Sequence, residues 1–259
     1  MLFLLSPAKT LDYQTAVPAP LAKKATEPLF MARAAELIDT LKTKKPAAVA
    51  SLMGLSDALA QLNVERYAAW QRQPAPPQVR PAVLAFAGDV YGGLAAQSLK
   101  TADLVWAQDH LVILSGLYGA LRPLDQLQPY RLEMGTALPT RRGKDLYAFW
   151  GDTVAEHLNE RLAGERSPWV VNLASIEYAR AALRPALQAR VVDCVFEDWK
   201  SGQYKIIGFF AKRARGLMAR YAVQQRARSP KALLGFDAEG YAYAAEVSSP
   251  DRLVFRRRV

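Results

Sequence analysis

The stretch Leu111-Val-Ile-Leu-Ser-Gly-Leu-Tyr-Gly119 decides the fold class of this chain. Its first four residues are an uninterrupted apolar run, which is typical of a β-strand buried on both faces. Small and polar residues follow at once, beginning with Ser115-Gly116, and they let the backbone turn sharply. The apolar stretch from Leu111 to Leu121 is flanked by His110 and Arg122 and is too short to span a bilayer. We therefore predict a central strand of a buried sheet, followed by a turn.

Similar apolar runs and helical patterns extend this prediction along the chain. Further strands are predicted at Leu2–Leu5, Val83–Phe86, Val170–Leu173, Val191–Phe196 and Lys205–Phe210. Helical patterns of apolar residues occupy residues 28–42, 47–71, 145–163, 176–188 and 210–227. Because strands and helices alternate, the sequence predicts a mixed α/β fold in which helices flank a central, mostly buried sheet. No repeat or long linker divides residues 1–259, so we expect a single compact domain.

Four of the predicted strands are followed by loops of the same style. These loops are Ser6-Pro-Ala-Lys9, Gly88-Asp-Val-Tyr91, Ser115-Gly-Leu-Tyr-Gly119 and Ala174-Ser175. In α/β sheets the carboxyl ends of strands form the usual ligand crevice, so the loops predict a shared cleft. The alternative is that glycine and serine only make turns here, as they do in most loops.

Cysteine and histidine are scarce in this sequence. Cys194 is the only cysteine, and His110 and His157 are the only histidines. An intrachain disulfide is therefore excluded, which fits a reducing cytoplasm, and a zinc or iron–sulfur site lacks ligands. We expect no metal and no cofactor. The apolar start Met1–Leu5 is too short for a signal peptide, so we expect a cytoplasmic protein with no membrane partner.

The net charge of +10 is concentrated in the last quarter of the chain. Residues 200–259 carry 13 Lys or Arg against 4 Asp or Glu, and no acidic residue lies between Lys200 and Phe236. A solvated helix face usually mixes both signs, because opposite charges four residues apart stabilise each other. An unpaired basic stretch repels itself, and a polyanion such as DNA would relieve that repulsion.

The predicted helix 210–227 combines an apolar stripe with a basic side. Phe210, Ala214, Leu217, Met218 and Tyr221 recur at helical spacing and predict one buried stripe. The basic side chains fall opposite that stripe, at Lys212, Arg213, Arg215, Arg220 and Arg226. Two such faces fit phosphate contact, whereas a membrane surface and an inert solvated face are the alternatives. The tail Arg256-Arg257-Arg258 is expected to add charge at a terminus that is often disordered.

The segment 47–70 has the pattern of a helix-hairpin-helix. An apolar helix ends before Gly54, which permits the turn, and Ser56 or Asp57 is placed to cap the second helix. In this motif the hairpin offers backbone N–H groups to a phosphate without reading bases. Ser56 replaces the second glycine usual in the motif, and an outward carboxylate at Asp57 would repel a phosphate. An ordinary helical hairpin is the alternative.

The region from Leu114 to Asp152 is dense in polar and aromatic residues between turns. It contains no Walker loop, no Rossmann fingerprint and no Ser–His–Asp set. Its basic side chains predict an anion clamp, with Glu133 or Asp145 as acidic partners; they are Arg122, Arg131 and Lys144. Internal ion pairs that fix a long loop are the alternative.

These strings together carry a resemblance to a known family. They are Ser6-Pro-Ala-Lys-Thr-Leu-Asp12, Gly88-Asp-Val-Tyr91, Leu114-Ser-Gly-Leu-Tyr-Gly119, Leu121-Arg-Pro-Leu-Asp125, Pro129-Tyr-Arg-Leu-Glu-Met-Gly135, Lys144-Asp-Leu-Tyr147, Phe149-Trp-Gly-Asp152, Asn172-Leu-Ala-Ser175 and Ala214-Arg-Gly-Leu-Met218. The chain resembles the bacterial YaaA family over essentially its whole length. The resemblance implies a mixed α/β domain with a basic cleft and a helix-hairpin-helix, DNA binding, peroxide resistance and lower free iron. It departs from the family motif at Ile176, where an acidic residue is usual.

We therefore expect a DNA-binding protein of the peroxide stress response that contacts the backbone of duplex or distorted DNA without sequence preference. The expected DNA-binding residues are Gly54, Ser56, Lys212, Arg213, Arg215, Arg220 and Arg226. The alternative is an enzyme that acts on a small anionic or nucleotide-like ligand in the strand-end cleft, although no catalytic set can be identified. The cleft candidates are Ser6, Lys9, Asp89, Arg122, Tyr130, Arg131, Glu133, Lys144, Asn172 and Ser175.

Overall fold

A twisted eight-stranded sheet forms the centre of the computed structural model, which describes residues 1–258. The strands lie in the order β11-β12-β9-β8-β1-β5-β6, and β10 pairs with β9 beside this path. Their bounds are β1 Leu2–Leu5, β5 Leu111–Ser115, β6 Gly119–Leu121, β8 Trp169–Leu173, β9 Arg190–Lys200, β10 Gln203–Lys205, β11 Ala242–Tyr243 and β12 Arg252–Arg257. The predicted mixed α/β fold with a central sheet is confirmed.

The middle of this sheet is parallel. β1 pairs in parallel with both β5 and β8, β8 pairs with β9, and β9 pairs with β12. Every residue of β1 and β5 is buried, which is why these two segments read as continuous apolar runs in the sequence. The parallel arrangement brings the carboxyl ends of β1, β5 and β8 to one edge of the sheet. This edge is where the predicted strand-end cleft has to lie.

Two of the predicted strands are wrong in most of their length. Residues Ala82–Ala85 form the short helix α5, and only Phe86–Ala87 is a strand, β4, which pairs with β2 at Thr10–Leu11. In the run Lys205–Phe210, the strand ends at Lys205 and helix α11 begins at Gly208. A short apolar run shows no periodicity, so it cannot distinguish a strand from a buried turn of helix. This explains both errors. A further small pair joins β3 Arg80–Pro81 to β7 Gln126–Leu127.

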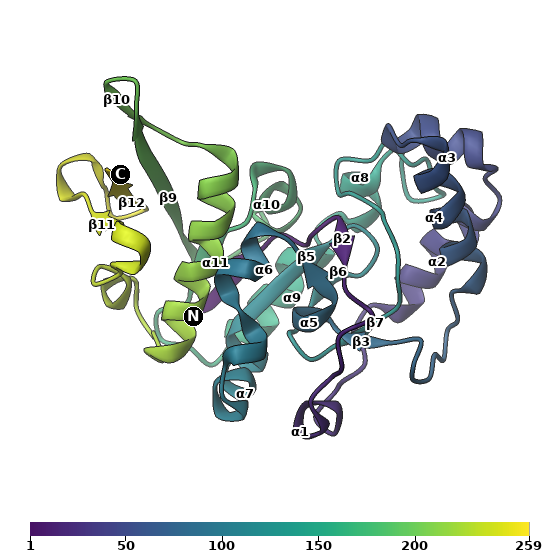
Figure 1. The fold of residues 1–259 in the computed structure, drawn as a ribbon, viewed down its shortest axis with the longest axis horizontal. Helices are drawn as coiled ribbons and strands as arrows, with labels where there is room; N and C mark the ends of the chain where they lie inside the picture. The colour runs from purple at the N-terminus through teal and green to yellow at the C-terminus, as the bar shows by residue number, and fades with distance from the viewer. Residues whose placement is uncertain (259) are drawn as a thin grey trace.

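Helices cover both sides of the sheet, and further helices lie beyond one of its ends (Figure 1). Their bounds are α1 Ala19–Ala22, α2 Met31–Lys42, α3 Pro46–Met53, α4 Asp57–Ala69, α6 Asp89–Leu94, α7 Thr101–His110, α8 Leu146–Trp150, α9 Thr153–Leu162, α10 Ile176–Ala182 and α11 Gly208–Gln224. Short 3₁₀ turns lie at Ala96–Ser98, Pro230–Leu233, Ala238–Gly240 and Ala245–Val247. The helical patterns of the sequence are confirmed, although two of them are broken, at Gly54 and at Gly151. Helices α2, α3 and α4 gather at one end of the molecule, and α11 lies towards the other (Figure 1).

Strand β12 makes the basic C-terminal segment part of the core. Its register places Arg256 opposite Glu197 and Arg257 opposite Asp198 on β9. Opposite charges on neighbouring strands stabilise each other, so the pairing neutralises both arginines. The expectation of free charge and disorder at this tail is therefore wrong for Arg256 and Arg257, which belong to β12, whereas Arg258 is exposed.

Helix α11 packs directly against helix α6 through glycine. A Cβ atom added to Gly216 would overlap the carbonyl oxygen of Val90, and one added to Gly93 would overlap the carbonyl oxygen of Arg213. The two backbones therefore approach more closely than side chains would allow. This close crossing fixes the position of α11 relative to the loop that precedes α6.

We predict that Gly216→Ala destabilises the protein by about 1–3 kcal/mol, because the added methyl group forces the two helix backbones apart. The matched control is Gly208→Ala in the same helix, where an added Cβ meets no atom within 4 Å. That variant should stay within about 0.5 kcal/mol of the parent. Urea unfolding of both variants measures the difference, and equal stabilities would contradict the glycine contact.

Candidate functional site

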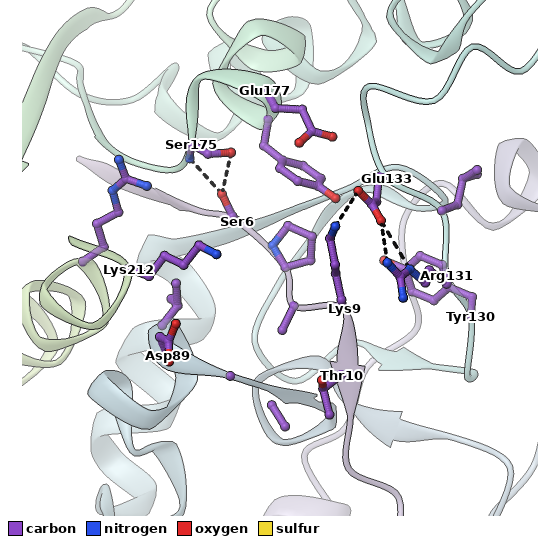
Figure 2. A pocket seen from close by; sticks show the side chains of 18 residues that line it. Ser6, Lys9, Thr10, Asp89, Tyr130, Arg131, Glu133, Ser175, Glu177 and Lys212 are labelled. Carbon is purple, nitrogen blue, oxygen red and sulfur yellow. Dashed lines mark hydrogen bonds and ion pairs between the residues drawn. The ribbon is translucent and has the colours of Figure 1, made fainter. Parts of the chain in front are cut away.

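A pocket of about 410 Å³ opens at the carboxyl ends of β1 and β8 (Figure 2). The loop after β1 forms one wall, the turn into α6 a second, the segment 130–133 a third, and α10 and α11 complete it. The lining residues are Ser6, Pro7, Ala8, Lys9, Thr10, Ala87, Gly88, Asp89, Val90, Tyr130, Arg131, Leu132, Glu133, Ser175, Glu177, Tyr178, Lys212 and Arg215. Three of the four strand-end loops named from the sequence thus meet around one cavity.

Two serines tie the strand ends together at the base of this strand-end pocket. The Ser175 N–H donates to Ser6 Oγ at 2.8 Å, and the Ser6 hydroxyl donates to Ser175 Oγ at 3.3 Å. The Tyr91 hydroxyl donates to the Ser6 carbonyl oxygen at 3.1 Å. The two serine bonds join residues 169 positions apart and hold the loops after β1 and β8 in fixed relation.

Glu133 is shared by two cations on one side of the pocket (Figure 2). Its Oε2 lies 3.1 Å from Lys9 Nζ, and its Oε1 accepts from Arg131 Nη2 at 3.1 Å. One carboxylate therefore offsets only one of these two positive charges. Lys9 is exposed, so its ammonium remains accessible to a ligand.

Neutral hydroxyl groups line the deeper part of the pocket. Tyr130 and Ser115 share a hydrogen bond of 2.6 Å, and Ser115 ends strand β5. Burial raises the pKa of Tyr130 well above its usual value and also raises the pKa of Tyr178. Both phenols are therefore neutral at physiological pH, and the Tyr130 hydroxyl is already engaged with Ser115.

The carboxylate of Glu177 also lines the pocket and is held at the start of α10. Its Oε1 accepts from the Gly135 N–H at 2.8 Å, and the Tyr147 hydroxyl donates to the Glu177 carbonyl oxygen at 3.0 Å. Asp89 is exposed in the first turn of α6 and lines the same pocket. Glu177, Tyr178 and Thr10 were not among the candidates from the sequence. The only signal for Glu177 was its place next to Ile176, the position where the family motif usually has an acidic residue.

Helix α11 adds two further cations, Lys212 and Arg215. Among residues 1–258, neither has an acidic group within 4.0 Å of its charged atoms, because no ion pair includes them. Burial lowers the pKa of the Arg215 guanidinium from its usual value, yet a guanidinium remains charged at any physiological pH. The sequence assigned both residues to a separate basic helix face, whereas they belong to the strand-end pocket.

The rest of the predicted basic face is not free. Arg213 Nε donates to Glu239 at 2.8 Å, and Arg226 Nη2 donates to Asp103 Oδ1 at 2.7 Å. Arg220 Nη1 donates to the carbonyl oxygens of residues 94 and 95 and, at 2.8 Å, to Ser98 Oγ. The prediction of a purely basic side without acidic partners is therefore wrong for Arg213 and Arg226, because the acids come from other parts of the chain.

Three cleft candidates from the sequence do not line the strand-end pocket: Arg122, Lys144 and Asn172. Arg122 pairs with Asp125 at 3.0 Å, which corresponds to the internal ion pair given as the alternative. Asn172 accepts from the Ala174 N–H at 3.0 Å and donates to Asp193 at 2.7 Å, so it shapes the loop that leads to Ser175.

Helices α3 and α4 form the hairpin that the sequence indicates. Gly54 adopts the left-handed conformation, with φ 61° and ψ 44°, and Ser56 precedes α4 in an extended conformation. Gly54, Ser56 and Asp57 are all exposed at the turn. Their use in DNA binding stays a prediction. No single helix in residues 1–258 is long and apolar enough to cross a membrane. Helices α3 and α4 reach the required length and apolarity only when taken together, and they are bent by 111° relative to each other.

Helix α4 connects the hairpin to the pocket. The Tyr67 hydroxyl donates to the carbonyl oxygen of Arg131, whose side chain lines the pocket. Arg66, the preceding residue, is half-buried; burial and, to a lesser degree, the nearby Arg131 charge lower its pKa. Arg66 and Arg131 thus place two like charges close together between α4 and the pocket.

The described residues contain one buried cysteine and no cluster of three metal-ligating side chains. Cys194 is buried on β9, and burial raises the pKa of its thiol far above the usual range. Reaction with peroxide requires the thiolate, so this thiol is inert. No three His, Cys, Asp or Glu side chains in residues 1–258 are grouped to hold a metal ion.

Fold and site define a mixed α/β protein whose cation-lined pocket sits at the carboxyl ends of parallel strands. The family model described as "Peroxide stress protein YaaA" matches residues 1–247, and the chain belongs to this family. Membership in this family supports a stress-related role for the protein.

Three relatives carry only the name UPF0246 protein. The relative from Leptothrix cholodnii is 68% identical over 257 residues, which cover 99% of this chain and 98% of that protein. The relatives from Methylibium petroleiphilum and Bordetella avium are 61% and 60% identical, and each alignment covers 100% of both proteins.

Proposed function

We propose that this protein binds DNA through its backbone phosphates during peroxide stress and thereby protects the DNA. One observation carries the proposal: Lys212 and Arg215 have no acidic partner among residues 1–258 and face the same pocket as Lys9 and Arg131. Cations that find no partner within the fold are available to phosphate groups.

The path of positive charge supports a polyanion rather than a single small anion. Arg66 lies on α4, and its neighbour Tyr67 donates to the carbonyl oxygen of Arg131, so positive charge continues from the pocket onto the helix that follows the hairpin turn. From there a bound backbone would run past Lys9 to the two cations on α11. Contacts of this kind position a duplex and carry no base information, so sequence preference should be weak.

A salt series tests the proposal. The logarithm of the affinity for a labelled 30-base-pair duplex should fall linearly with the logarithm of the salt concentration. The slope should be about 0.9 per phosphate contacted. The small number of free cations predicts about 2–4 contacts. A second duplex of unrelated sequence should give the same line. An affinity that is independent of salt would contradict phosphate binding.

A second candidate function is an enzyme that acts on a small anionic or nucleotide-like ligand. The observation that favours it is the presence of three carboxylates, Asp89, Glu133 and Glu177, in a pocket of small-molecule size. Carboxylates oppose phosphates but suit acid–base chemistry or hydrogen-bond donors on a ligand. The double variant Arg131→Gln, Glu133→Gln separates the functions: if the ligand is small, peroxide protection is lost while DNA binding survives.

A further inference from the structure

The most exposed large apolar side chain in residues 1–258 lies on the rim of the strand-end pocket. Ile176 is 89% exposed, compared with 59% for Phe209 and 58% for Leu29. It stands between Ser175 and Glu177, both of which line the pocket. An isoleucine gains nothing from this position in the free protein, because its side chain touches almost only water.

The pocket itself has the size of a site for one nucleotide and not for a duplex. Its volume of about 410 Å³ lies within the range of about 300–1,000 Å³ that is usual for small-molecule sites. Cations on α11 stand at one side together with Asp89, while the carboxylates of Glu133 and Glu177 lie across from them (Figure 2). Carboxylates accept hydrogen bonds from amino groups on a base, and cations bind its phosphate.

We propose that the strand-end pocket receives a single nucleotide extruded from bound DNA, and that Ile176 inserts into the gap left in the base stack. Apolar side chains of proteins that kink DNA enter base steps in this way. The cost of unstacking is smallest at a mismatched pair, so extrusion is expected there first. The inference rests on the proposed DNA binding and adds the part of the DNA that the pocket holds.

Phe209 supports the same geometry from the other side. It precedes Lys212 by three residues on α11, so the two side chains lie on the same side of this helix. Phe209 is exposed and forms a close ring pair with Phe210, at 4.0 Å between centroids. An aromatic face next to a phosphate-binding lysine suits the bases that flank an extruded nucleotide.

The test uses one titration with two signals. A duplex carries 2-aminopurine in a mismatched pair and a dye at one end; dye anisotropy reports binding, and 2-aminopurine emission reports unstacking. With the parent protein, emission should rise severalfold at saturation. Ile176→Gly should retain the parent anisotropy curve within about threefold and lose most of the rise in emission, because phosphate contacts remain. Ile176→Leu should keep both signals.

Two further variants complete the design. Thr10→Trp places a bulky ring at an exposed lining position and should block the pocket. Affinity should fall with the phosphate contacts of the pocket, and emission should stay low even where a higher protein concentration restores the full change in anisotropy. Leu29→Gly removes an exposed apolar side chain that is not part of the pocket lining and should change neither signal. Binding by the parent without a rise in emission would overturn the inference and leave the proposed function intact. A rise that survives in both Ile176→Gly and Thr10→Trp would also overturn it. Absence of any anisotropy change would overturn the proposed function itself.

Discussion

The double variant Lys212→Gln, Arg215→Gln is expected to bind duplex DNA about a hundredfold more weakly than the parent. Hydrogen bonds to charged groups contribute about 1.5–3 kcal/mol each, and each lost phosphate contact lowers the salt slope by about one. Because neither residue has an ion-pair partner among residues 1–258, the fold should lose less than about 0.5 kcal/mol. Fluorescence anisotropy over a salt series measures both the affinity and the slope.

The matched control is Arg213→Gln with Arg226→Gln, which removes the same amount of positive charge from α11 and its end. These arginines pair with Glu239 and Asp103, so their charges are already neutralised in the fold. The control should lose at most a few-fold in affinity, although it should lose some stability. Equal losses of affinity in both double variants would mean that DNA binding depends only on the net charge of the protein. The strand-end pocket would then no longer be the binding site.

Arg257→Met is expected to destabilise the protein by about 3–5 kcal/mol. Arg257 is buried, and its Nε donates to buried Asp198 at 2.6 Å, while the Tyr241 hydroxyl donates to the same carboxylate at 2.9 Å. The substitution leaves Asp198 charged, buried and without its cation. Removing one partner of a buried ion pair is strongly destabilising, because the remaining charge has no compensation. Urea unfolding measures the loss.

A double-mutant cycle distinguishes this explanation from a simple loss of packing. Asp198→Asn in the Arg257→Met background removes the stranded charge and still accepts from Tyr241, so it should recover most of the loss. The neighbouring control Arg258→Met removes an exposed arginine that stacks on Trp199 and should cost less than about 1 kcal/mol. Failure of Asp198→Asn to recover any stability would show that the methylene stem of Arg257, and not its charge, is what the core requires.

The sequence by itself determined the fold class and the core strands. β1 and β5 are buried on both faces, so β1 is an unbroken apolar run and β5 is one up to Ser115, and such runs are visible without a structure. β8 is apolar except at half-buried Asn172 and was recognised in the same way. The turn at Gly54 was equally visible, because a left-handed residue at a helix end is usually glycine. Four strand-end loops could be grouped in advance by their small and polar residues, and three of them line the pocket, although the directions of the strands were not derivable from the sequence.

Only the tertiary structure decided which charges are free. The acid that neutralises Arg226 lies 123 residues away, and the acids that neutralise the last arginines lie on β9. Counted along the chain, the segment between Lys200 and Phe236 contains basic residues and no acid. In the folded protein, Asp103 and Glu239 pair with arginines of this segment, and Glu197 and Asp198 pair with arginines of β12. Electrostatic pairing depends on distance in space, and sequence distance carries almost no information about it for long-range contacts. The sequence names five basic residues of the predicted helix 210–227 as binding candidates, and only the folded structure shows that Lys212 and Arg215 are the two without an acidic or carbonyl partner among residues 1–258.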